Sequence, residues 1–315
     1  MATRTARGLL LGREINYMIR ASGKSQAEAG QIIEVGQSRI NSLIAGTGRI
    51  SAGDLQLLAK QLGFSDEHYI QSLLELRRDK YRRGFWTTGH RRVYWEELRL
   101  LVDLEEQANR LRITESEIIP GLLQSESYIR ALHANMSDAH TGVTVEDWVQ
   151  ARLERQRNLV KADAPEFHAV LSESCLRRRH GDPKGHVMID QLRHLIDLSQ
   201  RPNILIQILP FNTPVDGGGM EDRFTLIRVP SPGAAGDLEL AVVEALGEIR
   251  YILDKPPVGA REALFARLSA AALSSEDSRE FIDHIAREEP KCSPSSPPTT
   301  ASKQRAARVG THACG

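Results

Sequence analysis

The segment between residues 25 and 46 constrains the fold of this chain more than any other part of its sequence. It reads SQAEAGQIIEVGQSRINSLIAG, and Ser25 and Glu28 have the spacing of a capping box that opens a helix. Apolar side chains recur where two short crossed helices would bury them: Ala29, Ile33, Val35, Ile40 and Leu43. Gly30 falls where the two helices approach most closely, and a large side chain would block that contact. The segment therefore predicts a pair of short helices packed across each other.

Burial of those positions leaves a polar face at the start of the second helix. Gln37, Ser38, Asn41 and Ser42 project together from it, and such a face suits base edges in the major groove of DNA. Gln37 can make a bidentate bond to adenine. Gln26 begins the first helix of the pair, where it can bond a phosphate and brace Gln37. The alternative is a helical bundle whose polar face is only solvated.

The charge distribution favours the DNA-binding interpretation. The whole chain has 41 basic and 41 acidic residues, which alone argues against a nucleic-acid partner. The first 83 residues, however, hold 13 Lys and Arg against 8 Asp and Glu, so an excess of positive charge lies in the segment that would face phosphates. Arg39, Thr47 and Arg49 are candidate phosphate contacts, with simple solvation as the alternative interpretation.

The helix pair and its polar face resemble the lambda-repressor type of helix-turn-helix, the XRE family. The resemblance covers about residues 8–78 and implies sequence-specific DNA binding. Two positions depart from the family pattern. Glu34 stands where the family usually has glycine in a left-handed turn, at a cost of roughly 1 kcal/mol. Gly36 stands where serine or threonine commonly caps the recognition helix.

Beyond this region the pattern becomes mixed. Residues 82–89 break the helical periodicity and set the expected boundary between a domain at 1–83 and a second domain at 84–289. Helices are predicted at 96–111, 126–134, 145–160, 187–199, 261–273 and 278–286, and strands at 167–172, 203–209, 223–229 and 238–245. Residues 290–315 predict a disordered tail. The expected fold class is multidomain: an all-α helix-turn-helix domain, a mixed α+β domain and a disordered tail.

The second domain resembles a large family of actinobacterial regulators that includes WhiJ-like and antitoxin-like XRE proteins. The stretch 104–132, centred on Pro120 to Gln124 and Tyr128, carries the resemblance, and it continues through Arg152 to Gln156. The family implies a transcriptional regulator that is often paired with a small protein encoded beside it. It implies no known ligand.

Enzymatic alternatives have weaker support in the sequence. Cys175 with His180 or His186 could form a nucleophile and base, but no third orienting residue accompanies them. Glu173, His180 and Asp182 lack a recognised metal-ligand spacing, and the glycines at 217–219 lack the pattern of a phosphate-binding loop. No enzyme activity, cofactor or metal is therefore expected, and the three separated cysteines predict unpaired thiols.

The sequence therefore predicts a DNA-binding transcriptional regulator that acts in the cytoplasm. No stretch is long enough to span a membrane, and the first 11 residues lack the pattern of a signal peptide. The expected form is a homodimer on a near-palindrome with half-site centres about 34 Å apart. A small partner protein or a small-molecule effector would act on the second domain, with residues 82–89 as the expected path to the helix-turn-helix. The main alternative is an antitoxin-like protein that binds a small partner and uses DNA binding for autoregulation.

Overall fold

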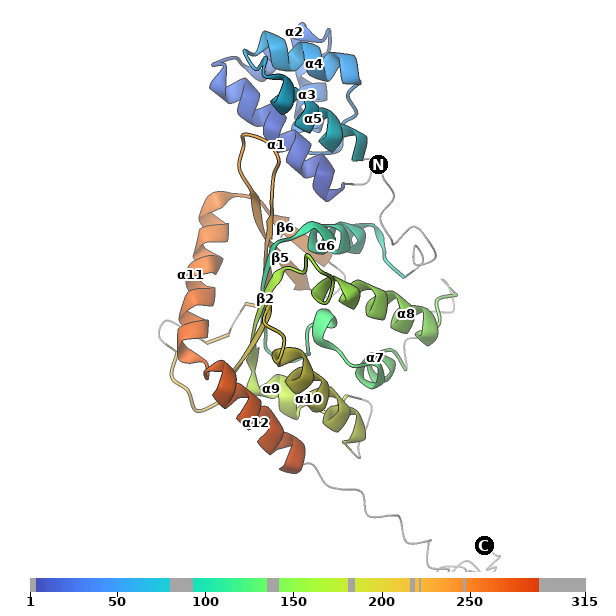
Figure 1. The fold of residues 1–315 in the computed structure, drawn as a ribbon, viewed down its shortest axis with the longest axis vertical. Coiled ribbons are helices and arrows are strands. Elements are labelled where there is room, and N and C mark those ends of the chain that lie inside the picture. Colours follow the sequence, from blue (N-terminus) through green and yellow to red (C-terminus); the bar gives the residue numbers. More distant parts are fainter. Residues whose placement is uncertain are drawn as a thin grey trace, which may run out of the picture.

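The computed structural model describes residues 4–79, 93–134, 142–180, 185–215, 219–220, 222–245 and 248–288. A helical unit at the amino-terminal end (residues 4–79) lies at one end of a larger mixed domain (residues 93–288), as Figure 1 shows. We call these parts the N-terminal unit and the C-terminal domain. The expected boundary at residues 83 and 84 and the expected tail lie outside the described residues.

The N-terminal unit has the five helices that the sequence predicts. They are α1 (Ala6–Ala21), α2 (Gln26–Ile32), α3 (Gln37–Ile44), α4 (Ala52–Gln61) and α5 (Glu67–Asp79). The predicted capping box is present, since the Ser25 side chain accepts from the Glu28 amide while the Glu28 carboxylate accepts from the Ser25 amide. The close approach at Gly30 is also confirmed, because a Cβ there would lie 2.5 Å from the carbonyl oxygen of Val35. Hydrophobic periodicity and local capping therefore account for this unit.

Glu34 adopts the left-handed backbone conformation that its position predicts. Its φ of 56° is the only positive φ of a non-glycine residue in the described chain. The side chain is exposed in the turn between α2 and α3. The backbone strain of this conformation is therefore present in the folded state without a buried contact to offset it.

Replacing Glu34 with glycine should stabilise the protein by about 0.5–1 kcal/mol. Glycine removes the left-handed penalty, while its greater freedom in the unfolded chain offsets part of the gain. Glu34→Ala is the matched control, because alanine keeps the Cβ and should bring no comparable gain. Thermal melting of the three proteins measures the difference, and equal effects of glycine and alanine would contradict the assignment.

The C-terminal domain combines one mixed sheet with helices on both of its faces (Figure 1). Its helices are α6 (Glu96–Gln107), α7 (Glu126–His133), α8 (Val145–Gln156), α9 (Glu173–Arg177), α10 (His186–Ser199), α11 (Lys255–Ala271) and α12 (Ser275–Glu288), with short 3-10 turns η2 (Gly121–Leu123) and η3 (Arg157–Leu159). Its strands are β1 (Arg110–Glu115), β2 (Glu166–Ser172), β3 (Ile204–Leu209), β4 (Phe224–Val229), β5 (Leu238–Ala245) and β6 (Glu248–Ile252). The predicted fold class, a helical unit followed by a mixed domain, is confirmed.

The sheet has the strand order β3-β2-β1-β4-β5-β6. Strands β1, β2 and β3 are parallel neighbours, whereas β4, β5 and β6 continue the sheet in antiparallel pairs. Parallel neighbours need long crossovers, which α7 to α10 supply. One face packs on α11 through an apolar cluster that includes Val170, Phe224 and Phe265, and α6, α8 and α10 lie on the other side. The central strands are therefore buried on both faces.

The sequence misplaces several elements of this domain. The helix predicted at 96–111 ends at Gln107, and residues 110–115 form β1 in the centre of the sheet. β6 is absent from the prediction. The helix predicted from residue 261 begins at Lys255, and α12 begins at Ser275. Strand pairing across the sheet overrides the local helical spacing of Ala108 and Leu111 in the case of β1.

Several residues of the two stretches that resemble the actinobacterial regulator family, 104–132 and 152–156, form a buried polar network. Arg155 makes two charge-assisted bonds to the Glu105 carboxylate, at 2.5 and 2.7 Å, and both side chains are almost fully buried. Arg152 donates to the Gln124 side chain at 2.8 Å, and Gln156 donates to the backbone carbonyl of Gln124. These contacts join α6, α8 and η2. The motif positions are therefore structural and do not form an open site.

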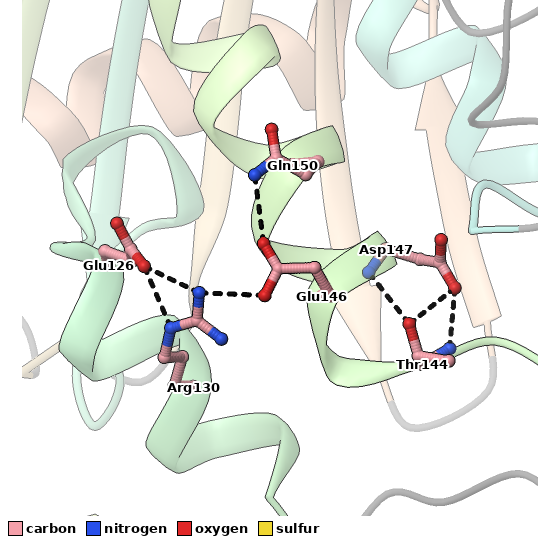
Figure 2. Close-up of polar contacts among 6 residues, drawn as sticks. All are labelled: Glu126, Arg130, Thr144, Glu146, Asp147 and Gln150. Carbon is pink, nitrogen blue, oxygen red and sulfur yellow. Dashed lines mark hydrogen bonds and ion pairs between the residues drawn. The ribbon is translucent and has the colours of Figure 1, made fainter.

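An exposed ion-pair network also connects α7 to α8 (Figure 2). The Arg130 guanidinium bonds Glu126 of its own helix and Glu146 of α8, at 2.7 and 2.9 Å. Thr144 and Asp147 close a capping box at the start of α8. These contacts are open to solvent, so solvent screening weakens them.

Asp103 of α6 connects the C-terminal domain to the start of α1. Its Oδ2 accepts a hydrogen bond of 2.5 Å from the amide of Ala6, the first residue of α1, and its Oδ1 accepts one of 3.0 Å from Gln107. Burial raises the pKa of Asp103 to about 6, although the bond from Ala6 opposes that shift. The folded protein therefore holds a proton on this carboxyl more tightly than the unfolded chain does.

Replacing Asp103 with asparagine should raise the free energy of unfolding at neutral pH. In the wild type the folded-state pKa lies above the ordinary value of about 3.9, so stability falls as pH rises from about 4 to about 6, by about 1.4 kcal/mol per unit. Asparagine keeps an acceptor for Ala6 and does not ionise. The advantage of Asp103→Asn should therefore grow across this window to about 3 kcal/mol and stay constant above it. Urea unfolding at several pH values measures it, and a pH-independent difference would contradict this account.

Candidate nucleic-acid interface

The structure places the predicted base-reading residues on one exposed face. Gln37 is the first residue of α3, and Gln37, Ser38 and Asn41 are all exposed. Ile40 and Leu43 of the same helix are buried in the core of the unit. The helix is short, so its exposed polar residues gather near its amino-terminal end. This is the end that enters the major groove when a helix-turn-helix binds DNA.

The side chains on this face differ in how far internal bonds engage them. Gln26, Gln37, Ser38 and Asn41 make no side-chain hydrogen bond to any residue that the structure describes. Ser42 is half-buried and its hydroxyl donates to the carbonyl of Arg39 at 2.7 Å. The first four side chains are therefore the ones that can bond a ligand without breaking an internal bond.

The three candidate phosphate contacts lie beside this face, in and after α3. The Thr47 hydroxyl donates to the Ser42 carbonyl at 3.1 Å. The Arg39 guanidinium donates to the carbonyl of Arg49, so Arg39 lies along the loop that follows the helix. Arg39 and Arg49 are exposed, while Thr47 is half-buried. The two arginines place positive charge next to the polar face, which suits contact with a DNA backbone.

The N-terminal unit has one further contact that the sequence does not predict. Arg13 and Glu14 of α1 contact the β4–β5 connection of the C-terminal domain, more than 200 residues away in the chain. The Glu14 side chain is fully buried. A glutamate in an amphipathic helix gives no sign of such a partner, because the helical pattern contains only local information.

The catalytic and metal-binding alternatives find no assembled site in the described part of the C-terminal domain. The Cys175 thiol is buried and donates to the Glu115 carbonyl at 3.3 Å, and burial raises its pKa, which makes it a poor nucleophile. The His180 ring packs edge-on against Tyr128. Asp182 lies outside the described residues. Among the residues that the structure describes, no group of three His, Cys, Asp or Glu is placed to hold a metal ion.

Two known protein families match parts of the chain. Residues 16–69 match the family described as helix-turn-helix, a range that covers the last part of α1, all of α2 to α4 and the start of α5. The N-terminal unit therefore contains an XRE-type helix-turn-helix, a domain typical of DNA-binding regulators. Residues 98–284 match the family described as Domain of unknown function (DUF5753), more than half of the chain. The protein belongs to the DUF5753 family.

No curated protein and no solved structure shows significant similarity to the chain. Within the described residues, no helix is both long and apolar enough to cross a membrane.

Proposed function

We propose that the protein is a sequence-specific transcription regulator whose α3 reads bases in the major groove of its operator. The observation that carries this proposal is the exposed set Gln37, Ser38 and Asn41 at the start of α3, which makes no internal side-chain bonds in the described chain. Gln26 bonds a phosphate and braces Gln37. The contact with DNA is completed by Arg39, Ser42, Thr47 and Arg49. The regulator acts in the cytoplasm and binds as a homodimer on a near-palindrome, with half-site centres about 34 Å apart.

The C-terminal domain is the control element in this proposal. About 70 residues suffice to read DNA, while roughly 200 more form a separate globular domain, a proportion that suits a second binding event. A cleft of about 560 Å³ lies between the two parts, lined among others by Arg7 of α1, Gln107 and Lys161. This volume is within the range of small-molecule sites. A small partner protein or a small molecule that binds the DNA-competent arrangement with a different affinity would change operator occupancy.

Mapping the genomic positions of the full-length protein in its own cells tests the regulatory function. We expect a limited set of promoter sites that share one sequence motif. Uniform recovery of genomic DNA, with no enriched positions, would contradict sequence-specific regulation.

The antitoxin-like function is the second candidate. The C-terminal domain is large enough to bind a small partner protein, and this size favours the candidate. Purification of the tagged full-length chain from its own cells tests this candidate, through identification of any small protein encoded beside its gene that co-purifies. Co-purification that leaves operator affinity unchanged would favour neutralisation over control. A change in operator affinity would favour partner-controlled regulation.

A further inference from the structure

The Glu14 carboxylate lies inside a ring of hydrogen-bond donors that come from both parts of the molecule. Ser231 donates through its hydroxyl at 3.0 Å, and the amides of Ala234 and Ala235 donate at 3.0 and 3.1 Å. Tyr69 of α5 donates its hydroxyl at 2.8 Å. Figure 1 shows the long β4–β5 connection reaching α1. A buried carboxylate with four donor groups is well satisfied, and bonds to a charged acceptor are stronger than neutral ones.

Arg13, the neighbour of Glu14 in α1, makes the complementary contact. Its guanidinium donates to the backbone carbonyls of Asp237 and Ala235, at 2.7 and 3.0 Å. Burial lowers the pKa of Arg13, and the nearby Glu14 opposes that effect. Helix α1 thus presents one acceptor and one donor group to the same turn. This two-way pairing fixes both the position and the orientation of α1 relative to the turn.

The turn itself is built to receive the carboxylate. We call residues 230–237 the hairpin tip. Asp237 bonds the amide of Ser231 and the side chain of Arg228, which holds the tip in shape. A Cβ on Gly233 would lie 2.2 Å from the carboxyl carbon of Glu14, so only glycine permits this approach. Because the carboxylate is enclosed, it has little room to move away from such a Cβ.

We propose that Glu14 is a positioning residue for DNA reading: its insertion into the hairpin tip fixes the N-terminal unit on the C-terminal domain. This inference rests on the proposed function, since it concerns how that function discriminates between operators. The hairpin tip contacts α1, and the base-reading side chains of α3 remain exposed. The contact thus fixes where α3 points while leaving it free to bind DNA.

A fixed orientation matters most when two reading units bind one DNA molecule. In the proposed homodimer, each docked unit would reach its half-site only when the separation of the half-sites matches the separation of the two docked units. A released unit explores many orientations, so its effective concentration at the second half-site falls and its sensitivity to half-site spacing decreases. Binding of one unit to a single half-site needs no such alignment.

The docking is tested first without DNA, by the distance between two spin labels on the full chain. The labels replace Gln61 of α4 and Ala263 of α11, both exposed, in a background with Cys292→Ser and Cys314→Ser, while the buried Cys175 stays unlabelled. Glu14→Gln and Gly233→Ala disturb the contact from opposite sides, and Gly233→Ala leaves Tyr69 unchanged. We expect at least a twofold broader distance distribution in both variants.

The matched controls are Glu67→Gln, which removes the same charge from an exposed position of α5, and Gly259→Ala in α11, where a Cβ meets no atom within 4 Å. Both controls should keep the narrow wild-type distribution. Glu14→Gln and Gly233→Ala distributions as narrow as that of the wild type would overturn the proposal.

The same variants are then measured on three duplexes that carry the operator motif recovered by selection from a random DNA library. One duplex has a single half-site, one has the selected pair of half-sites, and one has that pair moved apart by five base pairs. Glu14→Gln and Gly233→Ala should bind the single half-site as the wild type does and lose about tenfold on the selected pair. Their preference for the selected spacing should decrease. Unchanged spacing preference would overturn the positioning role, whereas a wild type that binds no duplex would refute the proposed function and leave the label distances to decide the docking.

Discussion

Replacing Gln37 with alanine should weaken binding to the operator by about 1–3 kcal/mol, a loss of roughly 5- to 150-fold. Gln37 is exposed at the first position of α3 and can offer its amide to an adenine edge. Binding to random DNA should change little, because that binding depends on phosphates. Electrophoretic or fluorescence titration on both DNAs measures the two affinities. An operator affinity that Gln37→Ala leaves intact would remove Gln37 from the interface.

Arg49→Ala is the contrasting variant in the same titrations. A phosphate contact contributes equally to all sequences, so operator and random DNA should both bind more weakly. The salt dependence should also become shallower, by close to one unit of slope for one lost contact. A loss confined to the operator would assign Arg49 to base reading instead.

Replacing Glu105 with leucine should destabilise the protein by about 3–5 kcal/mol, the largest stability effect that we expect. The substitution leaves the buried Arg155 guanidinium without its carboxylate. Burial lowers the pKa of Arg155, but the attraction and the hydrogen bonds of Glu105, together with the nearby Tyr94 and Glu244, raise it overall. Arg152 lies close by and burial lowers its pKa to about 10, so loss of Glu105 leaves two guanidinium groups in a poorly solvated region.

The double variant Glu105→Leu with Arg155→Met should recover most of that loss, because the second change removes the unpaired charge. Arg130→Met is the exposed control and should have a much smaller effect, since its partners are open to solvent (Figure 2). Urea unfolding measures all four proteins. A double variant as unstable as Glu105→Leu alone would show that packing, and not the uncompensated charge, causes the loss.

The parts of the fold that the sequence predicts are those set by local rules. The capping box at Ser25, the close approach at Gly30 and the left-handed turn at Glu34 each involve residues only a few positions apart. The five helices of the N-terminal unit follow from their hydrophobic periodicity. The exposed face of α3 then follows from which residues the core buries.

Elements that depend on distant partners are harder to predict. β1 continues a stretch whose apolar spacing fits a helix, and it becomes a strand because β2 and β4 pair with it on both sides. β6 has five residues and pairs only with β5 among the described strands. The start of α11 does have a local signal, since two prolines in its first turn are typical of a helix beginning.

Glu14 is the clearest case of a residue whose role sequence periodicity does not reveal. Its donors in the C-terminal domain, Ser231, Ala234 and Ala235, lie 217 to 221 positions away. Control was expected to pass through residues 82–89, which lie outside the described residues. The structure adds a second, non-covalent connection between the two parts, through Glu14 and through the bond from Ala6 to Asp103.

Selection of bound duplexes from a random DNA library by the purified full-length protein tests the central claim most directly. The account predicts enrichment of one motif, composed of two half-sites whose centres are about 34 Å apart, and loss of that enrichment in Gln37→Ala. Recovered duplexes with the same base frequencies as the starting library would contradict sequence-specific DNA binding by this protein.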